Sequence, residues 1–445
     1  MLVAGLLLLG GAGPALAQVA RPTVDPSAPT PTAPYAGLPP QGSAPDGSTV
    51  GGEALDTRGL VTVPGAPPLP AGIDAHGWLV ADATTGQVLG ARDPHGRYYP
   101  ASTLKTLTLL TLAPLLDHGL VVEGTTEDEA IEGSRVGLVH GGRYSVDLLF
   151  RALVMQSGND AANALARAAG GVPATLAAMD ATAERLGAFD TVAGTPSGLD
   201  VAGQSSSPYD LALIMRQLVA DPYTLDVLQT RTADMPGVEG LSAGYQIQSQ
   251  DTLLYDYPGT LGGKTGFTDA ARHTFVAAVE RNGRRLVVSV MQAERRPVHE
   301  LDQAKLLLDW GFATAPGSAG IGRLVAPGEV SVEAAPTTAL PTADTDDGEL
   351  SAEDAASASS SASSSSSSSS ASAARAAAAG PTSSSGTSPL LPVSLGGGAV
   401  LIVAATVIGR RQARRTVPVT PPAGSGAVRR PPSRRSGLPP DDATG

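Results

Sequence analysis

The sequence predicts an α+β fold for residues 72–313, in which helices are inserted into an antiparallel sheet. Residues 77–94 are typical of two short strands joined by a turn at Thr84-Thr85-Gly86. Residues 273–292 are typical of a longer hairpin closed by Asn282-Gly283, a strong two-residue turn signal. Helical patterns lie between these strand pairs and return at 298–312. This order of elements indicates an antiparallel sheet with helices grouped apart from it.

Capping signals delimit three of the inserted helices. Residues 145–155 begin at Ser145, a favourable N-cap residue. Residues 173–186 open on a proline and end before Gly187, and residues 208–219 follow Ser207 with a proline in the first turn. We therefore expect a mostly helical subdomain between the two strand pairs.

The chain before this domain resembles a leader followed by a spacer. Residues 1–17 form an apolar run ending in Ala15-Leu16-Ala17, which predicts a signal peptide cleaved after Ala17. No basic residue precedes the run, and an uncleaved membrane helix is the alternative. Residues 18–71 are rich in Pro, Ser, Gly and Ala, which predicts a disordered spacer.

The chain after the domain resembles a linker, a membrane helix and a tail. Residues 314–388 are a Ser/Ala-rich linker. Residues 390–408 contain no charge and are long enough to cross a bilayer, which favours a transmembrane helix over a buried core helix. Arginines follow at once from Arg410, so residues 409–445 are expected to be a cytoplasmic tail. The prediction is a single-pass cell-membrane protein with its folded domain outside the cell.

Composition excludes several classes of function. The formal charge of −12 disfavours a nucleic-acid partner. The sequence has no cysteine, which excludes disulfides, thiolate metal sites and cysteine nucleophiles. Its six histidines lack metal-ligand spacing.

Lysine is scarce, and its positions are informative. Only three of the 30 basic residues are lysines: Lys105, Lys264 and Lys305. Pro100 limits a helix to its C-terminal side, so Ser102 and Lys105 lie one turn apart at the start of an apolar helix. Ser102 is either an N-cap beside a solvated lysine, or a nucleophile whose proton goes to a desolvated amine. This segment alone leaves both interpretations open.

Two further motifs favour the catalytic interpretation. Ser157-Gly158-Asn159 falls between two predicted helices, although such a sequence is also ordinary turn chemistry. Lys264-Thr265-Gly266 precedes the second hairpin, where Lys264 is either an edge-strand charge or a ligand for an anion. The three motifs match the S-x-x-K, S-x-N and K-T-G pattern of penicillin-binding proteins and class A β-lactamases.

On these motifs, residues 72–313 resemble the low-molecular-weight penicillin-binding proteins, specifically the serine-type D-Ala-D-Ala carboxypeptidases of peptidase family S11. The segments TPSGLD and LLLDWGF add to the likeness. The resemblance implies a β-lactamase/transpeptidase-like fold and a hydrolase of peptidoglycan biosynthesis that affects the cell wall and cell shape. Its implied partners are the peptidoglycan stem peptide ending in D-Ala-D-Ala and β-lactam antibiotics, which act as covalent inhibitors.

The resemblance also implies a role for each site residue, in a mechanism with no metal or organic cofactor. Ser102 would attack the D-Ala-D-Ala peptide bond, with Lys105 as base and Ser157 passing the proton to the leaving amine. The remaining residues would bind substrate: Asn159 holds Lys105 and the substrate amide, Lys264 and Thr265 bind the terminal carboxylate, Gly266 allows close approach, and the Phe267 N–H joins that of Ser102 around the oxyanion.

Two rival functions stay open. One is a β-lactamase of the same fold. Class A enzymes need an additional Glu for deacylation, no E-x-x-L-N segment is present, and Glu184 belongs to a helix surface. The other is a non-catalytic sensor that recognises penicillin or peptidoglycan and signals through the arginine-rich tail.

Overall fold

The computed structural model describes residues 23–35 and 44–330. Their central element is a seven-stranded antiparallel sheet with the order β1-β3-β2-β10-β9-β8, in which β11 also pairs with β3. The strands are β1 (Leu60–Thr62), β2 (Gly77–Asp82), β3 (Gln87–Arg92), β8 (Thr260–Thr268), β9 (Arg272–Arg281), β10 (Arg284–Ala293) and β11 (Gly322–Arg323). β8 therefore forms one edge of the sheet.

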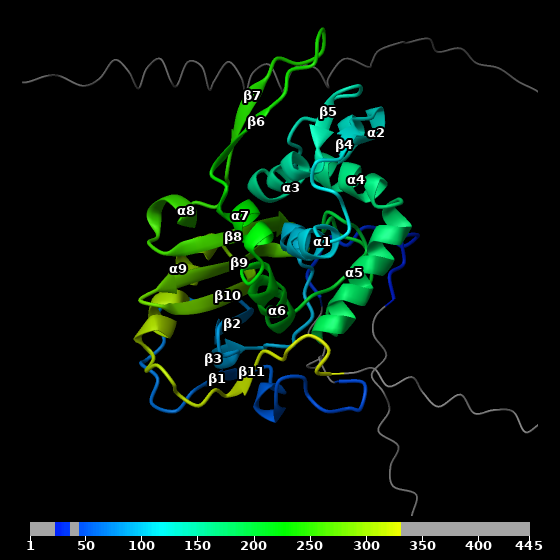
Figure 1. The fold of residues 1–445 in the computed structure, drawn as a ribbon. Helices are drawn as coiled ribbons and strands as arrows, with labels where there is room; N and C mark the ends of the chain where they lie inside the picture. The colour runs from blue at the N-terminus through cyan, green and yellow to red at the C-terminus, as the bar shows by residue number, and fades with distance from the viewer. Residues whose placement is uncertain (1–22, 36–43, 331–445) are drawn as a thin grey trace, which may run out of the picture. The chain divides into compact units, whose positions relative to one another are not determined.

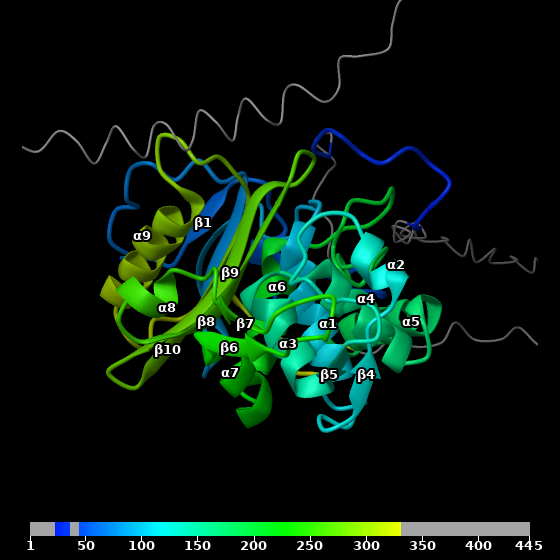
Figure 2. The ribbon, with the colours of Figure 1, turned by 90° about the horizontal axis from the view of Figure 1, so that it is seen from above.

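Helices cover both faces of this sheet (Figure 2). On one face α9 (Glu300–Ala313) packs against β2, β9 and β10. On the other face α6 (Pro208–Leu218) packs against the same three strands. Burial on both faces explains why β9 and β10 are apolar almost throughout, without the alternation of a half-exposed strand.

The helical subdomain lies on the α6 side of the sheet, and the hairpin β6–β7 projects from it (Figure 1). Its core is built by α1 packed on α3, α4, α5 and α6. The elements are α1 (Lys105–Leu112), β4 (Val121–Glu123), α2 (Thr126–Ala130), β5 (Arg143–Ser145), α3 (Val146–Met155), α4 (Asn159–Ala168), α5 (Val172–Leu186), α7 (Pro222–Gln229), β6 (Thr232–Met235), β7 (Tyr245–Gln248) and α8 (Leu253–Asp256).

The predicted α+β architecture is confirmed down to its caps. The Ser145 side chain accepts a hydrogen bond from the Leu148 N–H at the start of α3, and the Ser207 side chain accepts one at the start of α6. α5 ends on Gly187 with a φ of 79°, a left-handed conformation that a glycine adopts without strain. The β9–β10 turn is formed by Asn282-Gly283, as the sequence predicts.

The predicted disordered spacer, residues 18–71, is wrong for the described residues within it. β1 pairs with β3, and Val50, Leu55 and Val63 are buried in or beside the core. Farther upstream, the Tyr35 ring stacks on the Tyr99 ring with centroids 4.2 Å apart. High proline and glycine content misled the prediction, because a few well-placed apolar residues are enough to fix a segment to an existing sheet.

The predicted linker at 314–388 begins too early for the same reason. β11 pairs with β3, and Leu324 and Val325 are buried. Within the described residues, no helix is long and apolar enough to cross a membrane. The predicted signal peptide, transmembrane helix and tail fall at 1–17, 390–408 and 409–445, outside the described residues.

Candidate active site

The predicted nucleophile lies in a tight turn at the start of α1. Ser102 belongs to a short 3-10 helix, Ala101–Leu104, that leads directly into α1. No side chain caps this helix, so Ser102 is not the N-cap that the sequence left open as the alternative to a nucleophile. Ala101 is buried with a φ of 48°, a left-handed conformation that costs a non-glycine residue about 1–3 kcal/mol and is found most often at functional sites.

Lys105 points from the first turn of α1 back towards Ser102. Its Nζ lies 2.9 Å from Ser102 Oγ, 2.7 Å from Asn159 Oδ1 and 2.6 Å from the carbonyl oxygen of Ser197. The side chain has no exposed surface. A lysine on a helix surface would reach solvent, so this geometry also contradicts the alternative that Lys105 is a solvated lysine.

The protonation state of Lys105 follows from this burial. Burial lowers the pKa of its amine well below the ordinary value of 10.5, and the Lys264 cation lowers it further, while the Asp160 carboxylate acts in the opposite direction. In its neutral form the amine donates its two N–H groups to Asn159 Oδ1 and the Ser197 carbonyl, which can only accept hydrogen bonds. The amine lone pair is then left for the Ser102 hydroxyl proton.

The second motif joins α3 to α4. Ser157 is buried with a φ of 57°, a second strained residue in this site, and Asn159 is the first residue of α4. Asn159 Nδ2 donates to the Glu132 carbonyl at 2.7 Å, so its other side-chain atom, Oδ1, is the one that faces Lys105. The orientation of this amide is therefore fixed by hydrogen bonds on both sides.

The third motif lies on β8, the edge strand beside the nucleophile turn. A Cβ added to Gly266 would lie 2.4 Å from Thr274 Oγ1, 2.9 Å from the Ser102 nitrogen and 3.0 Å from the Thr103 nitrogen. Only glycine allows the strand to approach the turn this closely. Phe267 follows with half of its surface exposed.

Lys264 is the second buried amine of the site. Its side chain is almost fully buried, and Nζ donates to the Thr265 carbonyl at 2.7 Å. Burial lowers the pKa of Lys264 to about 7, and the Asp251 carboxylate opposes that shift. Burial also raises the pKa of Asp251 to about 6. Close to neutral pH, Lys264 is thus near the midpoint between cation and amine.

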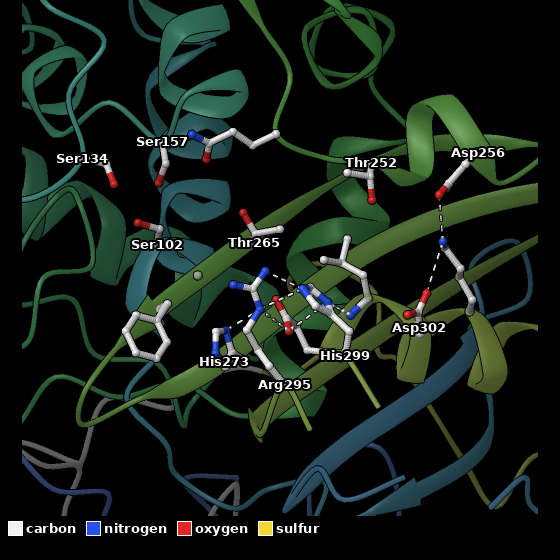
Figure 3. A pocket seen from close by; sticks show the side chains of 16 residues that line it. Ser102, Ser134, Ser157, Thr252, Asp256, Thr265, His273, Arg295, His299 and Asp302 are labelled. Carbon is white, nitrogen blue, oxygen red and sulfur yellow. Dashed lines mark hydrogen bonds and ion pairs between the residues drawn. The ribbon is translucent and has the colours of Figure 1, made fainter. Parts of the chain in front are cut away.

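These motifs meet at a cleft of about 710 Å³. The hydroxyls of Ser102, Ser134 and Ser157 lie close together at one end, and Thr265 lies between them and the other end (Figure 3). The structure thus brings together every residue that the sequence predicts for the site. Ser102, Ser157, Thr265, Gly266 and Phe267 line the cleft, while Lys105, Asn159 and Lys264 lie behind its walls.

Beyond Thr265 the cleft is lined by charged groups that the sequence did not single out. The Arg295 Nε donates to His299 Nε2 at 2.8 Å, and the buried Glu300 carboxylate lies 3.0 Å from His299 Nδ1. Farther along, Lys305 forms ion pairs with two carboxylates, at 3.1 and 3.4 Å (Figure 3). These residues carry no motif, so their place in the cleft comes only from the packing of α8 and α9.

Three other contributors to the site also escaped sequence reasoning. Ser197 acts through its backbone carbonyl, which no residue pattern reveals, although its segment TPSGLD was noted as part of the resemblance. Asp160 directly follows the second motif and Asp251 directly precedes a cleft residue. Adjacency to a motif residue was the available signal for Asp160, whereas the sequence offered none for Asp251.

Among the described residues, one group of His and carboxylate atoms is close enough to hold a metal: His95, Asp190 and Asp210. Both ring nitrogens of His95 are already used, Nδ1 by Asp190 at 2.8 Å and Nε2 by the Val50 carbonyl at 3.0 Å. This buried group does not line the cleft. It fits a hydrogen-bonded network better than an ion site.

The fold and the site define a class of enzyme. A serine at the start of a buried helix, paired with a buried lysine of lowered pKa and facing a cleft beside an edge strand, is the arrangement of a serine hydrolase with a lysine base. No histidine contacts the nucleophile among the described residues, so the Ser-His-Asp type does not apply.

Comparison with known proteins gives the family. The family model of D-alanyl-D-alanine carboxypeptidase, peptidase S11, matches residues 63–295. The D-alanyl-D-alanine carboxypeptidase DacB2 of Mycobacterium tuberculosis is 43% identical over 265 residues, which cover 58% of this chain and 89% of that protein. DacD of Salmonella typhimurium is 35% identical, over 56% of this chain and 66% of that protein. The chain belongs to the peptidase S11 family and is a serine-type carboxypeptidase.

Solved structures confirm the penicillin-binding, transpeptidase-like fold. A D-alanyl-D-alanine carboxypeptidase from Mycobacterium tuberculosis superposes with a TM-score of 0.57 at 41% identity, covering 59% of this chain and all of that one. A Streptomyces DD-transpeptidase superposes with a TM-score of 0.52 at 25% identity, covering 56% of this chain and all of that one. The predicted fold class is therefore correct for the catalytic domain.

Proposed function

We propose that this protein removes the terminal D-alanine from peptidoglycan stem pentapeptides through an acyl-enzyme on Ser102. The observation that carries the proposal is the buried Lys105 amine. Two groups that can only accept hydrogen bonds, Asn159 Oδ1 and the Ser197 carbonyl, hold it, and Ser102 Oγ is its third neighbour. Membership of the D-alanyl-D-alanine carboxypeptidase family supports the choice of substrate.

In the first step Ser102 Oγ attacks the carbonyl carbon of the D-Ala-D-Ala bond while Lys105 takes the hydroxyl proton. Ser157 is placed to pass that proton to the leaving amine, because its hydroxyl lies beside that of Ser102 in the cleft (Figure 3). The departing D-alanine leaves an ester on Ser102, which water then hydrolyses. The Ser102 and Phe267 N–H groups would hold the oxyanion; donors of this kind are worth about 10²- to 10³-fold each.

The terminal carboxylate would bind beside β8. Lys264 supplies positive charge and Thr265 a hydroxyl, and a bound carboxylate favours the cationic form of Lys264. Arg295 lines the cleft beyond Thr265 and lies 3.7 Å from the Glu300 carboxylate, so a second, partly paired cation is near an anionic substrate end.

We further propose that the enzyme works outside the cell, anchored by a helix at 390–408, and that penicillins inhibit it by acylating Ser102. The uncharged run followed by arginines supports the anchor. Deleting residues 390–408 from the otherwise complete chain should move the protein from the membrane fraction of cells to the soluble fraction. Unchanged membrane recovery would contradict the anchor.

The function is tested by incubating the purified full chain with a defined pentapeptide ending in D-Ala-D-Ala and measuring free D-alanine. The wild type should release D-alanine and be labelled covalently by a fluorescent penicillin, whereas Ser102→Ala should do neither. Rapid penicillin hydrolysis without D-alanine release would identify a β-lactamase instead. Stable labelling without any turnover would identify a sensor.

A further inference from the structure

The buried carboxylate of Asp160 stands immediately beside the site but has no part in the mechanism above. It is the second residue of α4, follows Asn159 directly and has no exposed surface. A buried carboxylate is costly unless its oxygens accept hydrogen bonds, so its partners indicate what it does.

Those partners are backbone N–H groups, three of them from one loop. Asp160 Oδ1 accepts from Val136 at 2.9 Å, and Oδ2 accepts from Gly137 at 2.7 Å and Leu138 at 3.0 Å. The remaining bond, from Ala161 to Oδ1 at 2.9 Å, lies within the first turn of α4. Charge-assisted bonds of this kind are stronger than neutral ones, so Asp160 ties residues 136–138 firmly to the start of α4.

The same loop controls the Asn159 amide. The Glu132 carbonyl accepts from Asn159 Nδ2 at 2.7 Å, and the Ser134 carbonyl accepts from the Asn159 backbone N–H at 2.7 Å. Because Nδ2 is held by Glu132, Oδ1 is the atom that receives the Lys105 amine at 2.7 Å. Ser134 also lines the cleft beside the nucleophile (Figure 3).

We propose that Asp160 is a positioning residue for acylation: by fixing loop 132–138 it fixes the Asn159 amide, which in turn holds Lys105 against Ser102. Asp160 touches neither the nucleophile nor the cleft. Its carboxylate acts on the Lys105 pKa at a distance, and its positioning effect passes through Asn159. The inference rests on the proposed function, because it presumes that Lys105 is the base.

The test is a double-mutant cycle on the second-order rate constant for acylation by a fluorescent penicillin. Asp160→Asn replaces one acceptor oxygen with an N–H₂ group facing backbone donors, so the loop should shift. The rate constant should fall about 10- to 100-fold, as expected for a displacement of catalytic groups by up to about 1 Å. Asn159→Ala should fall at least as far. The double variant should lose little more than Asn159→Ala alone, because both substitutions remove the same alignment.

A matched control is available in Asp128, a second buried carboxylate of the same subdomain. Its side chain accepts from Thr125 and Asn163 and pairs with Arg167 at 2.6 Å, and these hydrogen-bond partners include neither Asn159 nor loop 132–138. Asp128→Asn should lower the thermal midpoint but leave the acylation rate of the folded protein near that of the wild type. If Asp160→Asn does not fold, Asp160→Glu keeps the charge while displacing the loop and should show the same loss and the same lack of additivity.

Wild-type acylation by Asp160→Asn, or losses that multiply in the double variant, would overturn the positioning role. An acylation loss that matches that of Asp128→Asn would do so too, because it would reflect stability alone. These outcomes are distinct from failure of the proposed function, in which the wild type itself would not be acylated and would release no D-alanine.

Discussion

Replacing Lys105 with arginine keeps a positive charge beside Ser102 but removes a group that can accept a proton. Arginine stays protonated in proteins, whereas burial makes the Lys105 amine available in its neutral form. The substitution therefore separates two explanations of the buried amine. A base loses its function in the arginine variant, whereas a cation that only anchors Asn159 and Ser197 keeps part of it.

The expected size of the effect follows from the role. General-base catalysis contributes about 10²- to 10⁴-fold, which corresponds to roughly 3–5 kcal/mol of activation free energy. Three oxygens lie within 2.6–2.9 Å of Lys105 Nζ, so a guanidinium would also displace its neighbours. We expect acylation by Lys105→Arg to fall at least 10²-fold.

The assay is the rate of labelling by a fluorescent penicillin across pH, with thermal unfolding measured in parallel. Wild-type acylation should rise as pH increases through the depressed pKa of Lys105, because the neutral amine is the active form. Lys105→Arg should lack that rise. Lys105→Met should be as slow as Lys105→Arg, because neither side chain can accept the proton.

A folded Lys105→Arg protein that labels within tenfold of the wild type would remove Lys105 from the role of base. An arginine variant much faster than the methionine variant would instead favour the anchoring role. If the arginine variant alone does not fold, the wild-type pH profile decides, because a base predicts a rise in acylation through the depressed pKa of Lys105 whereas an anchoring cation predicts a fall.

Three further changes test other parts of the structure. Gly266→Ala should push β8 away from the nucleophile turn and lower the acylation rate on the order of 10²-fold. Gly59→Ala, where the added Cβ has room, should leave the rate unchanged. Equal rates for the two variants would contradict the close approach of β8 to the turn. Asp251→Asn removes the anion that raises the pKa of Lys264, so Lys264 should lose its positive charge at a lower pH than in the wild type. The Kd for a peptide with a free carboxylate should therefore begin to rise at a lower pH, and an unchanged pH profile would argue against this coupling. Leu55→Ala should lower the free energy of unfolding by about 2–5 kcal/mol in urea titrations, whereas a change below about 1 kcal/mol would restore the view of this segment as a spacer.

The elements that could be predicted from sequence are those specified locally. The turn at Asn282-Gly283 and the caps at Ser145 and Ser207 each depend on a few adjacent residues, and the structure has them where the sequence places them. The motif residues were found because their chemistry is specific in combination: two of three lysines fall within them. Their meeting in one cleft was implied by the family resemblance alone.

The missed features depend on contacts between distant parts of the chain. β1 is a three-residue strand that exists only because β3 offers an edge to pair with. The Ser197 carbonyl accepts a hydrogen bond from Lys105, which lies 92 positions earlier in the sequence. Arg295 lines the cleft from the segment that precedes α9. Neither composition nor periodicity carries information about such contacts.

β8 is the last strand of its sheet, and an enzyme that adds a substrate along such a strand has to keep one row of backbone hydrogen-bonding groups open. An open edge is also where sheets of different molecules join and aggregate. Here the edge faces a cleft whose opposite wall carries Ser134 and Ser157 from the helical subdomain. The wall that carries these hydroxyls therefore also limits what can dock on the strand, and loosening the subdomain would be expected to raise self-association as well as lower activity.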